Sequence, residues 1–215
     1  MVGIDLLSRG PALNPTMTNE QRVLLPLADG FEEIEAITII DVLRRAGLVV
    51  VVAGLTEATL ARGAHGIAVE VDCNLDDVDL EVIDAVVLAG GLPGATNLRD
   101  DRRVIGALQY MAARGRWTAA ICAAPIALAE AGLLSDSSVR ATSYPAFRDR
   151  LGNAEVVSDE PVVISGRVLT SAGPGTALDF ALTLAAVLVG PELASEIAVA
   201  MLAKMSLENP APASR

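Results

Sequence analysis

The chain alternates short, continuously apolar runs with longer segments in which apolar residues recur every three or four positions. A short apolar run between turn residues is typical of a strand that is buried on both faces of a sheet. Such runs predict the main strands at residues 22–28, 48–55, 84–88 and 117–121. Shorter runs predict additional strands at 139–143, 156–157, 162–164 and 168–171.

The segments between these runs have the helical period. Residues 31–46 place apolar side chains at positions 34, 37, 40 and 43, and Gly47 is suited to end that helix. Residues 100–114, the segment up to 189 and a last segment to about Met205 also predict helices. Alternating strands and helices are typical of parallel βαβ units. We therefore predict a doubly wound α/β domain with a mostly parallel sheet and helices on both faces.

The same pattern divides the chain into one domain and two ends. We expect residues 21–206 to form the domain, residues 1–20 to be a flexible N-terminal arm and residues 207–215 to be a frayed C-terminal tail. The sequence contains no internal repeat and no linker-like tract that would divide the domain.

Several predicted strand ends carry residues that are suited to chemistry. They are Asp29-Gly30 leading to Glu32, Glu33 and Glu35; Ala89-Gly90-Gly91; Cys122; and Gly173-Pro174-Gly175-Thr176. In an open parallel sheet, ligands bind beyond the carboxyl ends of the strands, so these residues are expected to converge. Each has an ordinary explanation when taken alone, since glycine pairs usually form tight turns and glutamates in a first helical turn are usually solvated.

Cys122 lies where the strand at 117–121 meets a helix-like run of alanine and leucine. A cysteine at such a turn has the geometry of a nucleophile elbow, with its sulfur at the sheet edge and a helix N-terminus pointing at it. The positive electrostatic field of that helix N-terminus is expected to lower the pKa of the thiol from about 8.5. The alternative is a buried, inert cysteine that acts as a small hydrophobic residue. The turn alone does not decide between them.

Composition and charge narrow the choice of partners. With 215 residues and 52% hydrophobic content, the chain can bury a sizeable core. Its net charge of −11, without a basic cluster, argues against nucleic acid and anionic membranes as partners. The N-terminus lacks an apolar core of signal-peptide length, so we expect a cytoplasmic protein. Cys73 and Cys122 have no metal-ligand spacing, and we expect neither a metal nor a cofactor.

The residues at the strand ends resemble the ThiJ/PfpI superfamily and, within it, the DJ-one subfamily. The resemblance covers roughly residues 22–204 and is carried, in family order, by residues 28–36 (ADGFEEIEA), 41–47, 86–91 (VVLAGG), 119–125 (AAICAAP) and 170–177 (TSAGPGTA). It implies a flavodoxin-like fold and a homodimer. It also implies a reactive Cys122 that is hydrogen-bonded to a protonated Glu35. Gly90, Gly91 and Ala123 would then stabilise an oxyanion, supported by the Gly173-Pro174 loop.

The resemblance implies two main functions, which the sequence does not separate. In the first, a glutathione-independent glyoxalase or deglycase-like enzyme uses Cys122 and Glu35 to convert 2-oxoaldehydes such as methylglyoxal or glyoxal to 2-hydroxy acids. In the second, the protein is an oxidative-stress sensor or holdase chaperone in which Cys122 is oxidised to a sulfinate. Small-molecule hydratase or protease relatives within the superfamily are a third option.

The chain departs from several family members at Tyr144, where they have a histidine before a proline. The single histidine, His65, falls in a different turn, so a Cys–His pair is not expected. Tyr144 would orient substrate or water, and proton transfer would depend on Glu35. We expect His65 to be a structural hydrogen-bonding residue and Cys73 to be structural.

Overall fold

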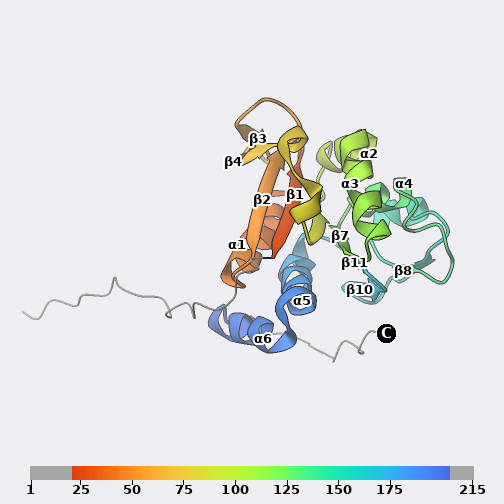
Figure 1. Ribbon diagram of the computed structural model, residues 1–215. Helices are drawn as coiled ribbons and strands as arrows, with labels where there is room; N and C mark the ends of the chain where they lie inside the picture. The colour runs from red at the N-terminus through yellow and green to blue at the C-terminus, as the bar shows by residue number, and fades with distance from the viewer. Residues whose placement is uncertain (1–20, 204–215) are drawn as a thin grey trace, which may run out of the picture.

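A seven-stranded sheet organises the computed structural model, which describes residues 21–203 (Figure 1). The strand order is β10-β11-β7-β6-β1-β2-β5. Neighbouring strands run parallel except β10, which is antiparallel to β11 at one edge. The strands are β1 (Arg22–Leu27), β2 (Val49–Gly54), β5 (Cys73–Asn74), β6 (Ala85–Leu88), β7 (Trp117–Ile121), β10 (Val162–Ser165) and β11 (Val168–Ser171).

Helices cover both faces of this sheet, as Figure 1 shows. One layer contains α1 (Glu33–Arg45), α5 (Ala177–Val189) and α6 (Pro191–Ala200), and the other contains α2 (Gly94–Asp100), α3 (Arg102–Ala113) and α4 (Pro125–Glu130). Leu25 of β1 packs into the first core, whereas its neighbour Leu24 packs into the second. Successive side chains of a strand point to opposite faces, so two covered faces require uninterrupted apolar runs. The predicted flavodoxin-like α/β fold is confirmed.

Smaller elements lie outside the main sheet. A hairpin consists of β3 (Leu60–Arg62) and β4 (Ala68–Glu70), and a short parallel pair consists of β8 (Arg140–Ala141) and β9 (Glu155–Val156). Short 3-10 turns occupy Leu75–Asp77, Leu80–Val82, Pro145–Arg150 and Pro174–Thr176. The turn predicted around residues 63–66 joins the two strands of the hairpin.

The sequence-based boundaries need correction in three places. The helix predicted at 100–114 is α3, which begins two residues later at Arg102, because the side chain of Asp101 caps it by accepting the N–H of Arg103 at 2.8 Å and Asp100 still belongs to α2. The strand expected at 139–143 is confined to Arg140–Ala141. The last helix ends at Ala200 and is followed by Leu202 in the left-handed region, with φ 56°.

The predicted N-terminal arm (1–20), the predicted tail (207–215) and the end of the expected last helix lie outside the described residues. Within residues 21–203, none of the helices combines the length and the apolar character that crossing a bilayer requires.

Candidate functional site

Cys122 follows the last residue of β7 and turns the chain sharply toward α4. Its φ of 63° lies in the left-handed region, which costs a residue other than glycine about 1–2 kcal/mol. Two backbone hydrogen bonds hold the turn. The N–H of Cys122 donates to the carbonyl of Ser171 at 2.9 Å, and its own carbonyl accepts the N–H of Tyr144 at 2.8 Å. The predicted strand-to-helix turn is confirmed, and the thiol is half-buried there.

Glu35 approaches this turn from the first turn of α1. Its side chain is fully buried, and Oε2 accepts the N–H of Gly90 at 2.7 Å. The other carboxyl oxygen, Oε1, has no hydrogen-bond partner among the described residues. A buried carboxyl with one unused oxygen is costly unless that oxygen has a function or carries a proton.

Gly90 lies at the point where the site residues meet. A Cβ atom added at Gly90 would lie 2.7 Å from Cβ of Cys122, 2.9 Å from Oε2 of Glu35 and 3.0 Å from the backbone nitrogen of Ala123. No side chain fits between these three groups, so only glycine lets β6, β7 and α1 approach so closely. The close approach at Gly90 therefore brings Cys122 and Glu35 together at the sheet edge, where the sequence predicts that they converge.

The pKa of Glu35 is raised to about 7, mainly by burial and in smaller part by the nearby negative charge of Glu32. The N–H of Gly90 and the thiol of Cys122 act in the opposite direction, because both stabilise the carboxylate. Desolvation of the carboxyl is the largest cause of the raised pKa.

The pKa of Cys122 is raised to about 12, mainly by burial and also by the charge and hydrogen bonding of Glu35. The backbone N–H groups of Gly91 and Ala123 lower it, because they favour the anionic sulfur, but they do not outweigh burial. The expected low thiol pKa is therefore wrong for the free protein. The sulfur keeps its proton while Glu35 is the more acidic member of the pair.

The remaining predicted residues lie around this pair in distinct positions. The N–H of Gly90 is occupied by Glu35, so the donors near the sulfur are those of Gly91 and Ala123. The ring of Tyr144 lies beside Gly173, where an added Cβ would come within 3.4 Å of it, and the ring is half-exposed. Pro174 begins the short 3-10 turn that follows β11, the strand whose last residue binds the N–H of Cys122.

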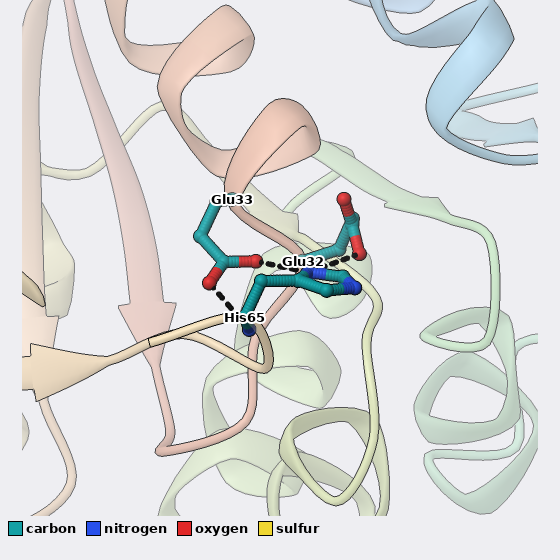
Figure 2. Close-up of side chains that lie close together, drawn as sticks. All are labelled: Glu32, Glu33 and His65. Carbon is teal, nitrogen blue, oxygen red and sulfur yellow. Dashed lines mark hydrogen bonds and ion pairs between the residues drawn. The ribbon is translucent and has the colours of Figure 1, made fainter. Parts of the chain in front are cut away.

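His65 lies in the β3–β4 turn and pairs with α1 (Figure 2). Its Nδ1 is 2.8 Å from Oε2 of Glu33 and 3.6 Å from Oε2 of Glu32. His65 therefore makes a side-chain hydrogen bond, as the sequence predicts. Glu33, by contrast, is 4% exposed, so the ordinary explanation of a solvated first-turn glutamate does not apply to it. Nothing in the sequence spacing links positions 33 and 65, because the hairpin brings them together.

Cys73 lies in the edge strand β5, at the opposite edge from β10. Burial, together with the charges of Asp72 and Asp77, raises the pKa of its thiol. These two carboxylates favour the protonated thiol, so Cys73 remains the structural cysteine that the sequence predicts.

Comparison with known proteins agrees with this geometry. The sequence matches the DJ-1/PfpI family over residues 21–187. Protein dj-1beta of Drosophila melanogaster is 41% identical over 180 residues, which are 83% of this chain and 95% of the fly protein. The glutathione-independent glyoxalase DJR-1.2 of Caenorhabditis elegans is 37% identical over 172 residues, which are 79% of this chain and 89% of the worm protein.

The fold comparison gives the same result. The structure of oxidized DJ-1 from Toxoplasma gondii has a TM-score of 0.81 and 38% identity, over 86% of this chain and 100% of that one. The chain spans about half the length of two Arabidopsis thaliana relatives, DJ-1 homologs B and A, of which it covers 45% and 46%. The family match covers most of the described domain, and the fly and worm relatives are matched over nearly their whole length. The chain therefore belongs to the DJ-1/PfpI family.

Proposed function

We propose that the protein is a cysteine-dependent, glutathione-independent glyoxalase or deglycase-like enzyme. Its substrates would be small 2-oxoaldehydes such as methylglyoxal or glyoxal, which it converts to 2-hydroxy acids. The observation that carries the proposal is the close approach of Cys122, Glu35 and the Ala123 nitrogen around Gly90. The glyoxalase name of the related worm protein supports the same reaction class.

The first step needs a base, because the thiol of Cys122 holds its proton tightly. The carboxylate of Glu35 is suited to this task, since a catalytic base is most effective when its pKa lies near the working pH. As sulfur attacks the aldehyde carbon, a C–S bond forms, the thiol proton moves to Glu35 and the carbonyl oxygen becomes an anion. The N–H groups of Gly91 and Ala123 stabilise that oxyanion, and Glu35 then protonates it to give a hemithioacetal.

The second step moves a proton within the bound substrate. The Glu35 carboxylate removes the hydrogen from the carbon that bears sulfur, and the resulting enediol is protonated at the neighbouring carbon. The product is a 2-hydroxy thioester, an isomer of the hemithioacetal. Water then cleaves the C–S bond, which releases the 2-hydroxy acid and the free thiol. The net reaction adds one water molecule and uses no redox partner. The half-exposed Tyr144, beside Gly173, would orient the substrate or the water.

A second candidate function is redox sensing with holdase activity. The favouring observations are that Cys122 is partly accessible and that the similar Toxoplasma protein is known in an oxidized form. A sulfinate at Cys122 would carry two oxygen atoms, which a protonated Glu35 and the N–H groups of Gly91 and Ala123 are able to bind.

A second copy of the chain is the partner that we propose for α1. Ile34 and Ile37, one helical turn apart, are 59% and 45% exposed. Ile67 of the neighbouring hairpin turn is 57% exposed, and its N–H reaches the Glu33 side chain. Contiguous exposed apolar side chains of this kind typically mark a protein interface. Burying them in a homodimer would remove that surface from water.

Loss of the thiol is expected to abolish the reaction. Cys122→Ala should reduce lactate formation from methylglyoxal, without glutathione, by about a hundredfold or more, because nucleophile and base act as a unit. Cys73→Ala is the matched control and should keep full activity. Wild-type turnover no faster than that of Cys122→Ala would rule out the enzyme.

The raised pKa of Glu35 predicts a pH-dependent stability. Unfolded Glu35 loses its proton near its ordinary value of 4.5, whereas folded Glu35 holds it up to about pH 7. The free energy of unfolding should therefore fall as pH rises between these values, by about 3 kcal/mol for this group. Glu35→Gln should remove that fall, as measured by urea unfolding at pH 5, 6, 7 and 8. Glu196→Gln, at an exposed glutamate of α6, is the control and should keep it. Parallel pH profiles of wild type and Glu35→Gln would contradict this assignment.

The sensing candidate predicts a localised oxidation. Mild peroxide should add about 32 Da to Cys122 and leave Cys73 unmodified, as read by peptide mass spectrometry. Protection of an aggregating client protein should then increase with the oxidised fraction. Equal protection by the reduced protein and by Cys122→Ala would exclude sensing through this thiol.

If a dimer forms through this surface, a charged residue placed in it should convert the dimer to a monomer. Wild type should elute at about twice the chain mass of 22.2 kDa, and Ile34→Lys should elute as the monomer, because a lysine cannot be buried in the apolar contact. Light scattering coupled to gel filtration measures this. Val199→Lys, at a side chain of α6 that is 72% exposed, is the control. A dimeric Ile34→Lys variant would place the interface elsewhere.

A further inference from the structure

We propose that Glu32, Glu33 and His65 form a binding site for a divalent first-row transition-metal ion. Figure 2 shows the three side chains pointing toward one another from the start of α1 and from the β3–β4 turn. The proposed reaction uses none of them as a reacting group, and only the charge of Glu32 acts on that site, through the pKa of Glu35. It departs from the sequence-based expectation of no metal, which considered only the cysteines.

The donor atoms have the spacing of adjacent metal ligands. Nδ1 of His65 is 2.8 Å from Oε2 of Glu33 and 3.6 Å from Oε2 of Glu32. Metal–ligand bonds of about 2.1 Å place neighbouring donors about 3.0 Å apart in an octahedral site and about 3.4 Å apart in a tetrahedral one. The three donor atoms lie within 4.8 Å of one another, so rotations of the side chains would bring them onto one ion. The ion would then replace the shared proton between His65 and Glu33.

Contacts through Oε1 hold the Glu33 carboxylate in place and leave Oε2 available to bind a metal ion. Its Oε1 accepts the N–H of His65 at 2.6 Å and that of Ile67 at 3.4 Å. The carboxyl also packs on the backbone of Gly63, where an added Cβ would lie 2.3 Å from Oε1. Oε2 is therefore fixed toward His65. Such outer hydrogen bonds are what orient a ligand in established metal sites.

The charge of the cluster is not balanced within the described part of the chain. The side chains of Glu32 and Glu33 are only 13% and 5% exposed, and no lysine or arginine described here lies within 4.0 Å of either carboxylate. Their one ionic partner is His65, whose side chain is 70% exposed. Buried carboxylates are usually paired with cations or bound to metals. A divalent ion would neutralise both.

The types of donor atom and their exposure to solvent indicate which class of metal ion the site would bind. One imidazole nitrogen with two carboxylate oxygens suits zinc and neighbouring transition metals, whereas calcium and magnesium prefer oxygen ligands alone. In a single chain the side chain of His65 is 70% exposed, which gives the ion a path from solvent and room for water ligands before the proposed dimer forms. Zn²⁺ is therefore the probe of choice, with Co²⁺ as its spectroscopic substitute.

Zinc binding to metal-free protein tests the site by calorimetry. Wild type is expected to bind one Zn²⁺ per chain at this site, and His65→Ala to weaken it at least about tenfold, since even loss of a supporting residue costs that much. Cys122→Ala and Glu196→Gln are controls that should bind as wild type does. The histidine variant is informative because its exposed side chain can be removed without opening the core, which far-UV circular dichroism checks.

Cobalt spectra distinguish this site from a thiolate site. Co²⁺ bound to Glu32, Glu33 and His65 should show visible d–d bands, lost in His65→Ala, without the near-ultraviolet charge-transfer band that a cysteine ligand produces. Binding that survives His65→Ala, a charge-transfer band that disappears in Cys122→Ala, or no saturable binding by wild type would each overturn the proposal.

Discussion

The absence of a side chain at Gly90 is the constraint on which the site depends. Cys122, Glu35 and the backbone nitrogen of Ala123 all lie within 3.0 Å of the position that its Cβ would occupy. The glycine allows the end of β6 to lie against the turn after β7 and against the first turn of α1. It also donates its N–H to Glu35, which fixes the carboxyl next to the sulfur. One backbone position thus sets both the distance and the orientation of the Cys122–Glu35 pair.

The burial that brings the pair together also determines its proton chemistry. Desolvation is the largest cause of the raised pKa of each group, so neither ionises as it would in water. Because the carboxyl is the more acidic of the two, the pair is better described as a thiol with an adjacent base than as a preformed thiolate. This arrangement needs no histidine. It agrees with the presence of Tyr144 where several family members have one.

The sequence predicts the fold well because burial on both faces leaves a clear signal. β1, β2, β6 and β7 are uninterrupted apolar runs, and their carboxyl ends carry the residues that meet. Helix α2 was not predicted, because its start at Pro93 and Gly94 has the composition of a turn. The thiol pKa was predicted in the wrong direction, because local sequence indicates a helix N-terminus but not the loss of water. The Glu33–His65 pair was not predicted, because a hairpin, not sequence spacing, joins them.

Helical geometry explains how three glutamates in four residues acquire three different environments. Glu32 is the N-cap residue of α1, and its charge is near enough to Glu35 to raise the pKa of that buried carboxyl. Within the helix, Glu33 and Glu35 lie about 200° apart around the axis, so Glu33 faces the β3–β4 turn while Glu35 faces Gly90. Ile34, between them, faces solvent on the proposed dimer surface. One turn of α1 therefore supplies the base beside Cys122, the cluster with His65 and the exposed apolar contact. A change in the pitch or position of that turn would alter all three together.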